Sequence, residues 1–334
     1  MRNMLILSLI LWLCLVGSSV AQSAKAQEHL ACIYSPQGNK VQAVFSAPFP
    51  LLVETSALVY DPDDSSFFTT ADKGEPHLIQ FRLVSDSIEI LRAGVVQGLD
   101  GNYDFEGVEL VRDSLGSKLL MISTERLWEK DSLVCFGVDT DSFALVEDRR
   151  FRILPLGAGR NNNLEGICHD PTNDWYYVAK ERGPCGLYAW SEPVGQIEIF
   201  RGSEFEMRLM RFLFDSMAGK VSEHRLESLG LVSLSGLAFD RETGHLLMLN
   251  RYGRSVIELD VYPQEEQPYQ ILSVLPFEGI DCDFFTLQGI SDRDRYGLAE
   301  GLAVFGNGDQ KKLAIITDPG ANQRPHLFVF PYLR

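Results

Sequence analysis

The stretch Glu165-Gly166-Ile167-Cys168-His169-Asp170 decides the fold, because its pattern occurs four more times along the chain. Each copy begins with Glu or Ser, continues with Gly or Ala, and then runs into a short apolar segment. The copies begin at residues 56, 106, 165, 235 and 300, so 50, 59, 70 and 65 residues separate them. The other four are Ser56-Ala57-Leu58-Val59-Tyr60-Asp61, Glu106-Gly107-Val108-Glu109-Leu110, Ser235-Gly236-Leu237-Ala238-Phe239-Asp240 and Glu300-Gly301-Leu302-Ala303-Val304.

The segments after each copy also repeat. Turn residues such as Asp170-Pro171-Thr172-Asn173 come first, and such clusters indicate tight hairpins. A second apolar segment comes next and a third stands after a loop. We expect the second strands at 67–70, 119–123, 175–179, 245–249 and 313–316. We expect the third strands at 77–83, 132–138, 186–190, 255–260 and 326–330.

Short strands joined by turns, without alternating helices, predict an all-β protein and exclude βαβ units. Repetition of this unit is typical of a β-propeller, whereas chance similarity among the strands of a β-sandwich is the alternative. We therefore predict a five-bladed β-propeller that forms a single domain over residues 28–334. The expected strand at 40–45 closes the ring as the outer strand of the last blade. Residues 191–234 are too long for a strand and a turn, and we interpret them as an insertion.

The first 27 residues predict a signal peptide. Arg2 precedes the apolar run Met4 to Gly17, and small residues place cleavage near residue 21 or 26. An uncleaved N-terminal anchor is the alternative. The rest of the chain contains no transmembrane segment by hydropathy. A periplasmic or secreted location is expected.

The chain is acidic, with a formal charge of −16. Removal of residues 1–27, which contain Arg2, Lys25 and no acid, would change this charge to −18. The balance argues against nucleic acid and anionic membranes as partners, since both need clustered Lys or Arg. It is compatible with metal cations, and it equally serves solubility. We expect a monomer.

Five cysteines remain after the signal, at positions 32, 135, 168, 185 and 282. An odd number without Cys-x-x-Cys spacing gives little support to a disulfide framework or a zinc site. Buried free thiols are the expected state.

The first strand of each propeller blade lines the central axis, so three equivalent residues, Glu106, Glu165 and Glu300, should converge there. Asp104 and Asn163 precede two of them by two residues and share their strand face. Converging carboxylates repel one another unless a cation lies between them. An oxygen-rich set without His or Cys favours Ca²⁺. The alternative is that the glutamates only hydrogen-bond to neighbouring strands or to trapped water.

A second set of polar residues stands where the second strands end. These side chains could form a pocket at one mouth of the channel, although turn capping explains each of them equally well. The set comprises Asp72, Glu125, Glu181, Asn250 and Asp318.

Nucleophilic catalysis finds little support in the sequence. The segment 230–236 does not match the Gly-x-Ser-x-Gly elbow. His169 comes four residues after Glu165 but stands beside a turn, where a structural histidine is the simpler interpretation.

The repeat as a whole resembles the SdiA-regulated family over about residues 50–330. The resemblance rests on segments such as Asn163-Leu164-Glu165-Gly166-Ile167, Ala299-Glu300-Gly301-Leu302-Ala303 and Val178-Ala179-Lys180-Glu181-Arg182. It implies a five-bladed propeller with a calcium site, distantly related to NHL-repeat propellers. Two positions depart from the family pattern: Ser56-Ala57 replaces the usual Ser-Gly, and Asn250-Arg251 stands where an acidic residue is commoner. Related phytase-like or lactonase-like propellers stay open as alternatives.

Two functions are compatible with these observations. The preferred one is an exported calcium-binding propeller that serves as a binding or scaffold module at the cell envelope, for an unknown ligand or envelope protein. The alternative is a calcium-dependent hydrolase of a phosphoester, ester or lactone, in which the ion polarises a substrate oxygen. In an enzyme, His169 or Asp104 would point at the ion.

Overall fold

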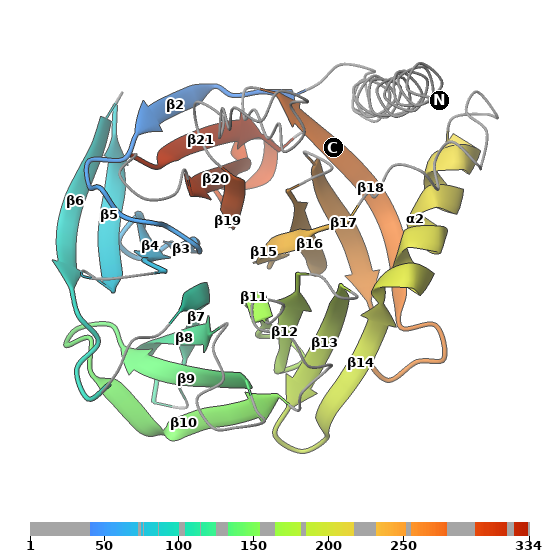
Figure 1. The fold of residues 1–334 in the computed structure, drawn as a ribbon, viewed down its shortest axis with the longest axis horizontal. Coiled ribbons are helices and arrows are strands. Elements are labelled where there is room, and N and C mark those ends of the chain that lie inside the picture. Colours follow the sequence, from blue (N-terminus) through green and yellow to red (C-terminus); the bar gives the residue numbers. More distant parts are fainter. Residues whose placement is uncertain are drawn as a thin grey trace, which may run out of the picture.

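The computed structural model describes thirteen stretches of the chain and shows five sheets arranged around a central axis (Figure 1). This confirms the predicted five-bladed propeller. The expected signal peptide at 1–27 lies outside the described residues. These are 41–72, 75, 77–85, 87–99, 104–113, 115–124, 133–153, 164–181, 185–216, 232–251, 255–278, 298–318 and 324–332.

Each blade begins with its innermost strand and continues outward in sequence order, except that N-terminal strands form the outer edges of blades four and five. Blade one contains β3 (Val59–Asp61), β4 (Ser66–Thr70), β5 (Leu78–Val84) and β6 (Ser87–Gly94). Blade two contains β7 (Phe105–Arg112), β8 (Lys118–Thr124), β9 (Leu133–Asp139) and β10 (Leu145–Ile153). Blade three contains β11 (Leu164–Asp170), β12 (Trp175–Lys180), β13 (Gly186–Ser191) and β14 (Gly195–Arg201). Blade four contains β15 (Leu234–Asp240), β16 (His245–Asn250), β17 (Ser255–Val261) and β18 (Tyr269–Glu278). Blade five contains β19 (Leu298–Phe305), β20 (Lys312–Asp318) and β21 (His326–Pro331), and a 3₁₀ turn η1 (Gly308–Gln310) precedes β20.

The N-terminal segment closes the ring, although not with the predicted residues. Strand β2 (Phe45–Pro48) pairs antiparallel with β21 as the outer strand of blade five. Strand β1 (Val41–Gln42) instead pairs parallel with β18 and extends blade four to five strands. The expected closing strand at 40–45 therefore divides between two blades. The addition of β2 gives blade five four strands, as in blades one to three.

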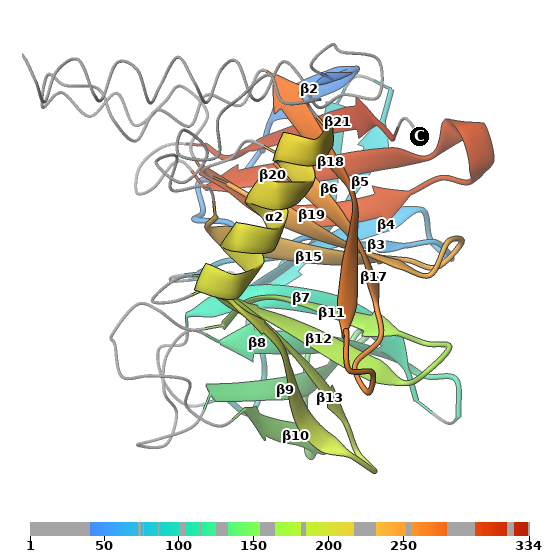
Figure 2. The ribbon, with the colours of Figure 1, turned by 90° about the vertical axis from the view of Figure 1, so that its right-hand side faces the viewer.

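The segment 191–234, expected as an insertion, begins as regular blade structure. Strand β14 is the outer strand of blade three, and the helix α2 (Gly202–Ser216) comes directly after it. Figure 2 shows α2 lying along the outside of the ring. Phe205 and Leu209 of the helix are buried in one cluster with residues of β14 and β18, and the Phe205 ring stacks on Phe200 at 4.1 Å between centroids. The helix thus covers apolar side chains that the edge of blade three would otherwise expose. The described part of the chain holds no helix with the length and apolar character to span a bilayer.

Each Glu-Gly or Ser-Gly pair of the repeat lies at a β-bulge of an innermost strand. The register shifts at 105/107, 164/167, 234/237 and 299/301, in blades two to five. A Cβ on Gly166 would lie 2.5 Å from the backbone nitrogen of Leu237 in the next blade. Gly107, Gly236 and Gly301 face the backbone of the following blade just as closely, at 2.4, 2.8 and 2.5 Å. Glycine is required here because the inner strands approach one another more closely than any side chain permits.

Hydroxyl groups connect the blades beside these bulges. Ser123 Oγ donates to the carbonyl of Glu165 at 2.7 Å, and Ser235 Oγ donates to the carbonyl of Ala299 at 2.9 Å. Blade one has Ala57 at the glycine position and instead uses Ser56, whose hydroxyl donates to the carbonyl of Phe105. These buried bonds satisfy carbonyl groups that the bulges remove from the sheet ladder.

Ion pairs with buried aspartates connect blades at the opposite end, where the hairpins turn. Lys118 Nζ at the start of β8 lies 2.6 Å from Asp61 at the end of β3. Lys311 Nζ lies 2.9 Å from both carboxylate oxygens of Asp240 in the preceding blade. The ring is therefore tied at both ends of its inner strands.

Three of the five cysteines that follow the signal segment are among the described residues, and all three are free and buried, as expected. They are Cys135, Cys168 and Cys185; burial raises the pKa of each thiol, to about 12 for Cys185. These thiols act as small apolar core residues.

The glycine contacts generate a test of the ring. We expect Gly166→Ala to lower the free energy of unfolding by roughly 1–3 kcal/mol, because the added methyl group forces two backbones apart. Thermal melting measures the loss. Gly94→Ala is the matched control, since a Cβ on that outer-strand glycine would meet only a side chain, the ring of Phe143 at 3.2 Å, and no backbone atom. Equal melting temperatures for the two variants would show that the inner strands do not depend on this contact.

Candidate functional site

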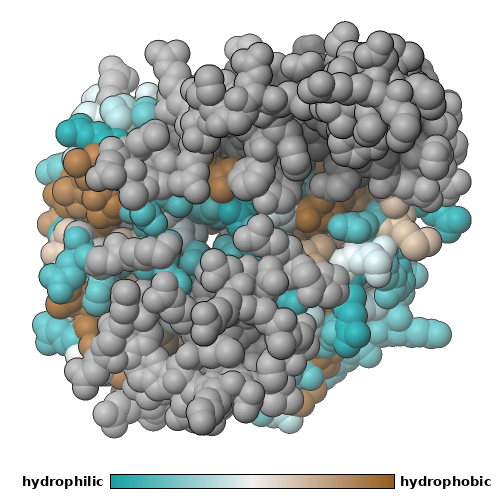
Figure 3. All heavy atoms as spheres, viewed as in Figure 1, coloured by the Kyte–Doolittle hydropathy of each residue, from teal (hydrophilic) through white to brown (hydrophobic). Residues whose placement is uncertain are grey.

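The two predicted sets of polar residues lie at the same end of the blades. Antiparallel pairing places the start of each first strand beside the end of the second: Phe105 pairs with Thr124, and Leu164 pairs with Lys180. The same holds for Leu298 and Asp318. The axial and mouth sets therefore form one surface. Figure 3 shows hydrophilic side chains gathered around the centre of the ring in the view along its axis.

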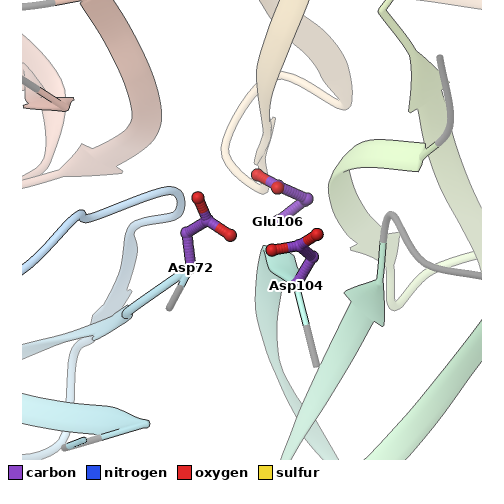
Figure 4. Close-up of side chains that lie close together, drawn as sticks. All are labelled: Asp72, Asp104 and Glu106. Carbon is purple, nitrogen blue, oxygen red and sulfur yellow. The ribbon is translucent and has the colours of Figure 1, made fainter. Parts of the chain in front are cut away.

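Three carboxylates from blades one and two converge on this surface. Asp104 directly precedes β7, Glu106 is the second residue of that strand, and Asp72 lies just beyond β4. One carboxylate oxygen from each lies within 4.8 Å of the others, and Figure 4 shows the three side chains pointing toward one another. Asp104 and Glu106 are buried, and Asp72 is half-buried. The backbone N–H of Asp72 donates to the carbonyl of Glu54 at 2.7 Å, which fixes the position of this residue.

Glu165 and Glu300 take part in a different arrangement, around a buried arginine of blade four. Arg251 comes directly after β16, and its guanidinium lies 2.5 Å from Glu300 Oε1, 2.5 Å from Glu181 Oε1 and 3.8 Å from Glu165 Oε1. All four side chains are no more than 8% exposed. A protein cation therefore lies among three carboxylates that come from blades three and five.

The structure thus regroups the predicted residues. Asp72 and Glu181, expected at the mouth, lie with axial carboxylates instead of in a separate ring. Asn250 is buried and accepts a hydrogen bond from the backbone of Ser233 at 3.2 Å, as a capping residue would. Asp318 ends β20 and is half-buried. Asn163 and Glu125 lie outside the described residues. Arg251, noted in the sequence only as a departure from the family pattern, is the residue that sequence reasoning did not place in the site.

Comparison with known families identifies the family of the chain. The model of the family described as SdiA-regulated matches residues 49–280, which is more than half of the chain. The chain belongs to the SdiA-regulated family.

Several solved structures resemble this SdiA-regulated protein at low sequence identity. Glutaminyl cyclase from Myxococcus xanthus is 16% identical, with 89% of this chain and all of that chain covered and a TM-score of 0.46. A chain of the nidogen/laminin complex is 14% identical, with 82% and 80% covered and a TM-score of 0.43. A protein of unknown function from Bacteroides caccae is 11% identical, with 81% and 73% covered and a TM-score of 0.43.

A second charged contact crosses the SdiA-regulated ring toward its hairpin end. Arg241, which comes directly after β15 in blade four, donates to the carbonyl of Leu110 in blade two at 3.1 Å. Its guanidinium also lies 3.7 Å from the buried carboxylate of Glu109. Burial raises the pKa of Glu109 to about 7, although Arg241 and backbone hydrogen bonds from Leu110 and His169 oppose the shift. The turns on either side of β16 therefore supply arginines at both ends of the inner strands.

Glu109 generates a prediction of pH dependence. Its pKa is about 7 in the folded protein and 4.5 in its ordinary state, so between these values the unfolded chain releases a proton that the folded protein keeps. Stability is therefore lost as the pH rises from 4.5 to 7, by up to about 3 kcal/mol. Glu109→Gln removes the titration. We expect its melting temperature to equal that of wild type near pH 4.5 and to exceed it at pH 8.

The control is Glu89→Gln, which removes an exposed acid on the outer strand of blade one. The difference in melting temperature between Glu89→Gln and wild type should change little over the same pH range. A Glu109→Gln variant that is less stable than wild type at pH 8 would show that the ion pair with Arg241 outweighs the cost of burial.

Proposed function

We propose that this SdiA-regulated protein is an exported calcium-binding propeller that acts as a binding module at the cell envelope. The observation that carries the proposal is the convergence of Asp72, Asp104 and Glu106 within 4.8 Å at the end of the inner strands. The carboxylates come from separate segments of two blades. A cation held between them would connect those blades and offset the mutual repulsion of the charges.

The chemistry of the donors fits a hard cation. All three ligands are carboxylates, and Ca²⁺ takes six to eight oxygen ligands in flexible geometry. Three side chains therefore leave coordination positions for backbone carbonyls, water or oxygens of a bound molecule. Because the triad lies on the hydrophilic face around the axis, the ion would supply a positive point to which an anionic or hydroxyl-rich ligand binds.

Export and an envelope location are supported by the sequence of residues 1–27, with its basic start and apolar run. The acidic composition supports a partner other than nucleic acid.

A binding role accounts for the site better than the alternative calcium-dependent hydrolase. Asp104 points into the triad, as the hydrolase alternative also expects, but there it would serve as a ligand of the ion and not as a separate base. His169 is engaged elsewhere, since its Nε2 lies 3.0 Å from Asp174. It also stands four residues beyond Glu165 toward the hairpin end of β11, which corresponds to about 13 Å along a strand.

Calcium should stabilise the protein through the triad. A ligand that binds only the folded state raises the free energy of unfolding by about 2.7 kcal/mol at one hundred times its Kd. We therefore expect calcium to raise the melting temperature of wild type after chelation. Asp104→Asn and Glu106→Gln should each reduce this shift, because both variants keep the shape of the side chain and remove a charge.

The control is Glu204→Gln, an exposed acid on α2, which should retain the full calcium shift. A wild type without any calcium-dependent shift would exclude the site. Robust turnover of aryl esters, lactones or phosphomonoesters that is lost with a chelator would favour the hydrolase over the binding module.

A further inference from the structure

The arrangement around Arg251 separates the axial carboxylates into two groups. The triad of Asp72, Asp104 and Glu106 belongs to blades one and two. Glu165, Glu181 and Glu300 belong to blades three and five, and the guanidinium of Arg251 contacts all three. We propose that Arg251 is the resident cation of the second group, and that it confines divalent metal binding to the triad.

The position of Arg251 is fixed by its surroundings. Its backbone N–H donates to the carbonyl of Ser233 at 3.0 Å, and the Ser233 hydroxyl donates to Glu181 Oε1 at 3.0 Å. The Ser233 N–H in turn donates to the side chain of Asn250 at 3.2 Å. The residue before Arg251 and one of its carboxylate partners are thus held by the same serine. The guanidinium is therefore held between blades three and five, where it meets Glu181 and Glu300.

Charge explains why this group would not take a metal ion. A guanidinium offers several N–H donors in a planar fork and stays protonated, so it satisfies two carboxylates at 2.5 Å as a fixed positive charge. A divalent ion that entered the same space would meet this charge at close range. The metal ion could bind only if the guanidinium moved away from the glutamates. The buried guanidinium would then have lost its paired charges, which is costly.

Removal of the arginine should have the opposite effect. Glu165, Glu181 and Glu300, which the guanidinium now separates, would then face one another without a cation, and a small inward movement of these side chains would bring their oxygens around an ion. We infer that a neutral residue at position 251 creates a second divalent-cation site. The expectation of one ion in wild type rests on the proposed function, whereas the gain of an ion on removal of Arg251 does not.

The experiment compares wild type with Arg251→Gln and Arg251→Lys, with Ca²⁺ as the probe. Equilibrium dialysis counts bound ions, and thermal melting is recorded with chelator and with calcium. We expect one ion in wild type, two in Arg251→Gln and one in Arg251→Lys, because lysine retains the charge. Arg251→Gln should melt below wild type in chelator and recover with calcium. Arg241→Gln, at the other end of the same hairpin, is the matched control and should bind one ion.

The outcomes separate the two claims. No bound ion in wild type and one in Arg251→Gln would contradict metal binding at the triad and support the role of Arg251. One ion in both proteins would leave the triad intact and overturn the role of Arg251.

Glu300→Gln in the wild-type background tests the inference even if Arg251→Gln does not fold. Because Glu300 pairs with Arg251 and not with the metal, this variant should melt lower by the same amount with and without calcium. A smaller calcium shift in Glu300→Gln would place the ion at Glu300 and contradict the proposal.

Discussion

The fold depends on the close approach of the five inner strands around the axis. Between neighbouring blades, the position that a Cβ of Gly107, Gly166, Gly236 or Gly301 would occupy lies 2.4–2.8 Å from the next backbone. Only glycine fits, and the bulge at each of these residues turns the preceding side chain away from the sheet ladder. The close approach of the inner strands therefore also places the polar side chains of the repeat at one end of these strands.

This arrangement brings charges of the same sign close together, so they repel one another unless a cation neutralises them. Buried and half-buried carboxylates from four blades meet on one surface, and charges of one sign destabilise a fold unless they are paired. On the side of blades three and five, Arg251 supplies the opposite charge to Glu181 and Glu300 at 2.5 Å. On the side of blades one and two, we propose that calcium does so. On this proposal, a side-chain cation neutralises the carboxylates on one side of the ring and a metal ion neutralises those on the other.

The number of blades could be predicted from the sequence because the close approach of the inner strands requires glycine. Glu-Gly or Ser-Gly pairs therefore recur once per blade in blades two to five, and the repeat can be recognised. The sequence also brought Glu106 together with Asp104. It separated Asp72 and Glu181 from the axial residues, although antiparallel pairing, as of Leu164 with Lys180, places both sets at one end. The reach of Arg251 to two other blades depends on tertiary packing, and no local pattern encodes it. The division of 40–45 between β1 and β2 likewise depends on two edges distant in sequence.

The central claim is that two different cations neutralise one ring of carboxylates. A crystal structure of the protein grown with Mn²⁺ as a substitute for Ca²⁺ tests it most directly, because anomalous scattering locates the metal without reference to the surrounding atoms. We expect one anomalous peak, between Asp72, Asp104 and Glu106, with the Arg251 guanidinium in place between Glu181 and Glu300. A peak among Glu165, Glu181 and Glu300 with Arg251 displaced, or the lack of any peak on the axis, would contradict the claim.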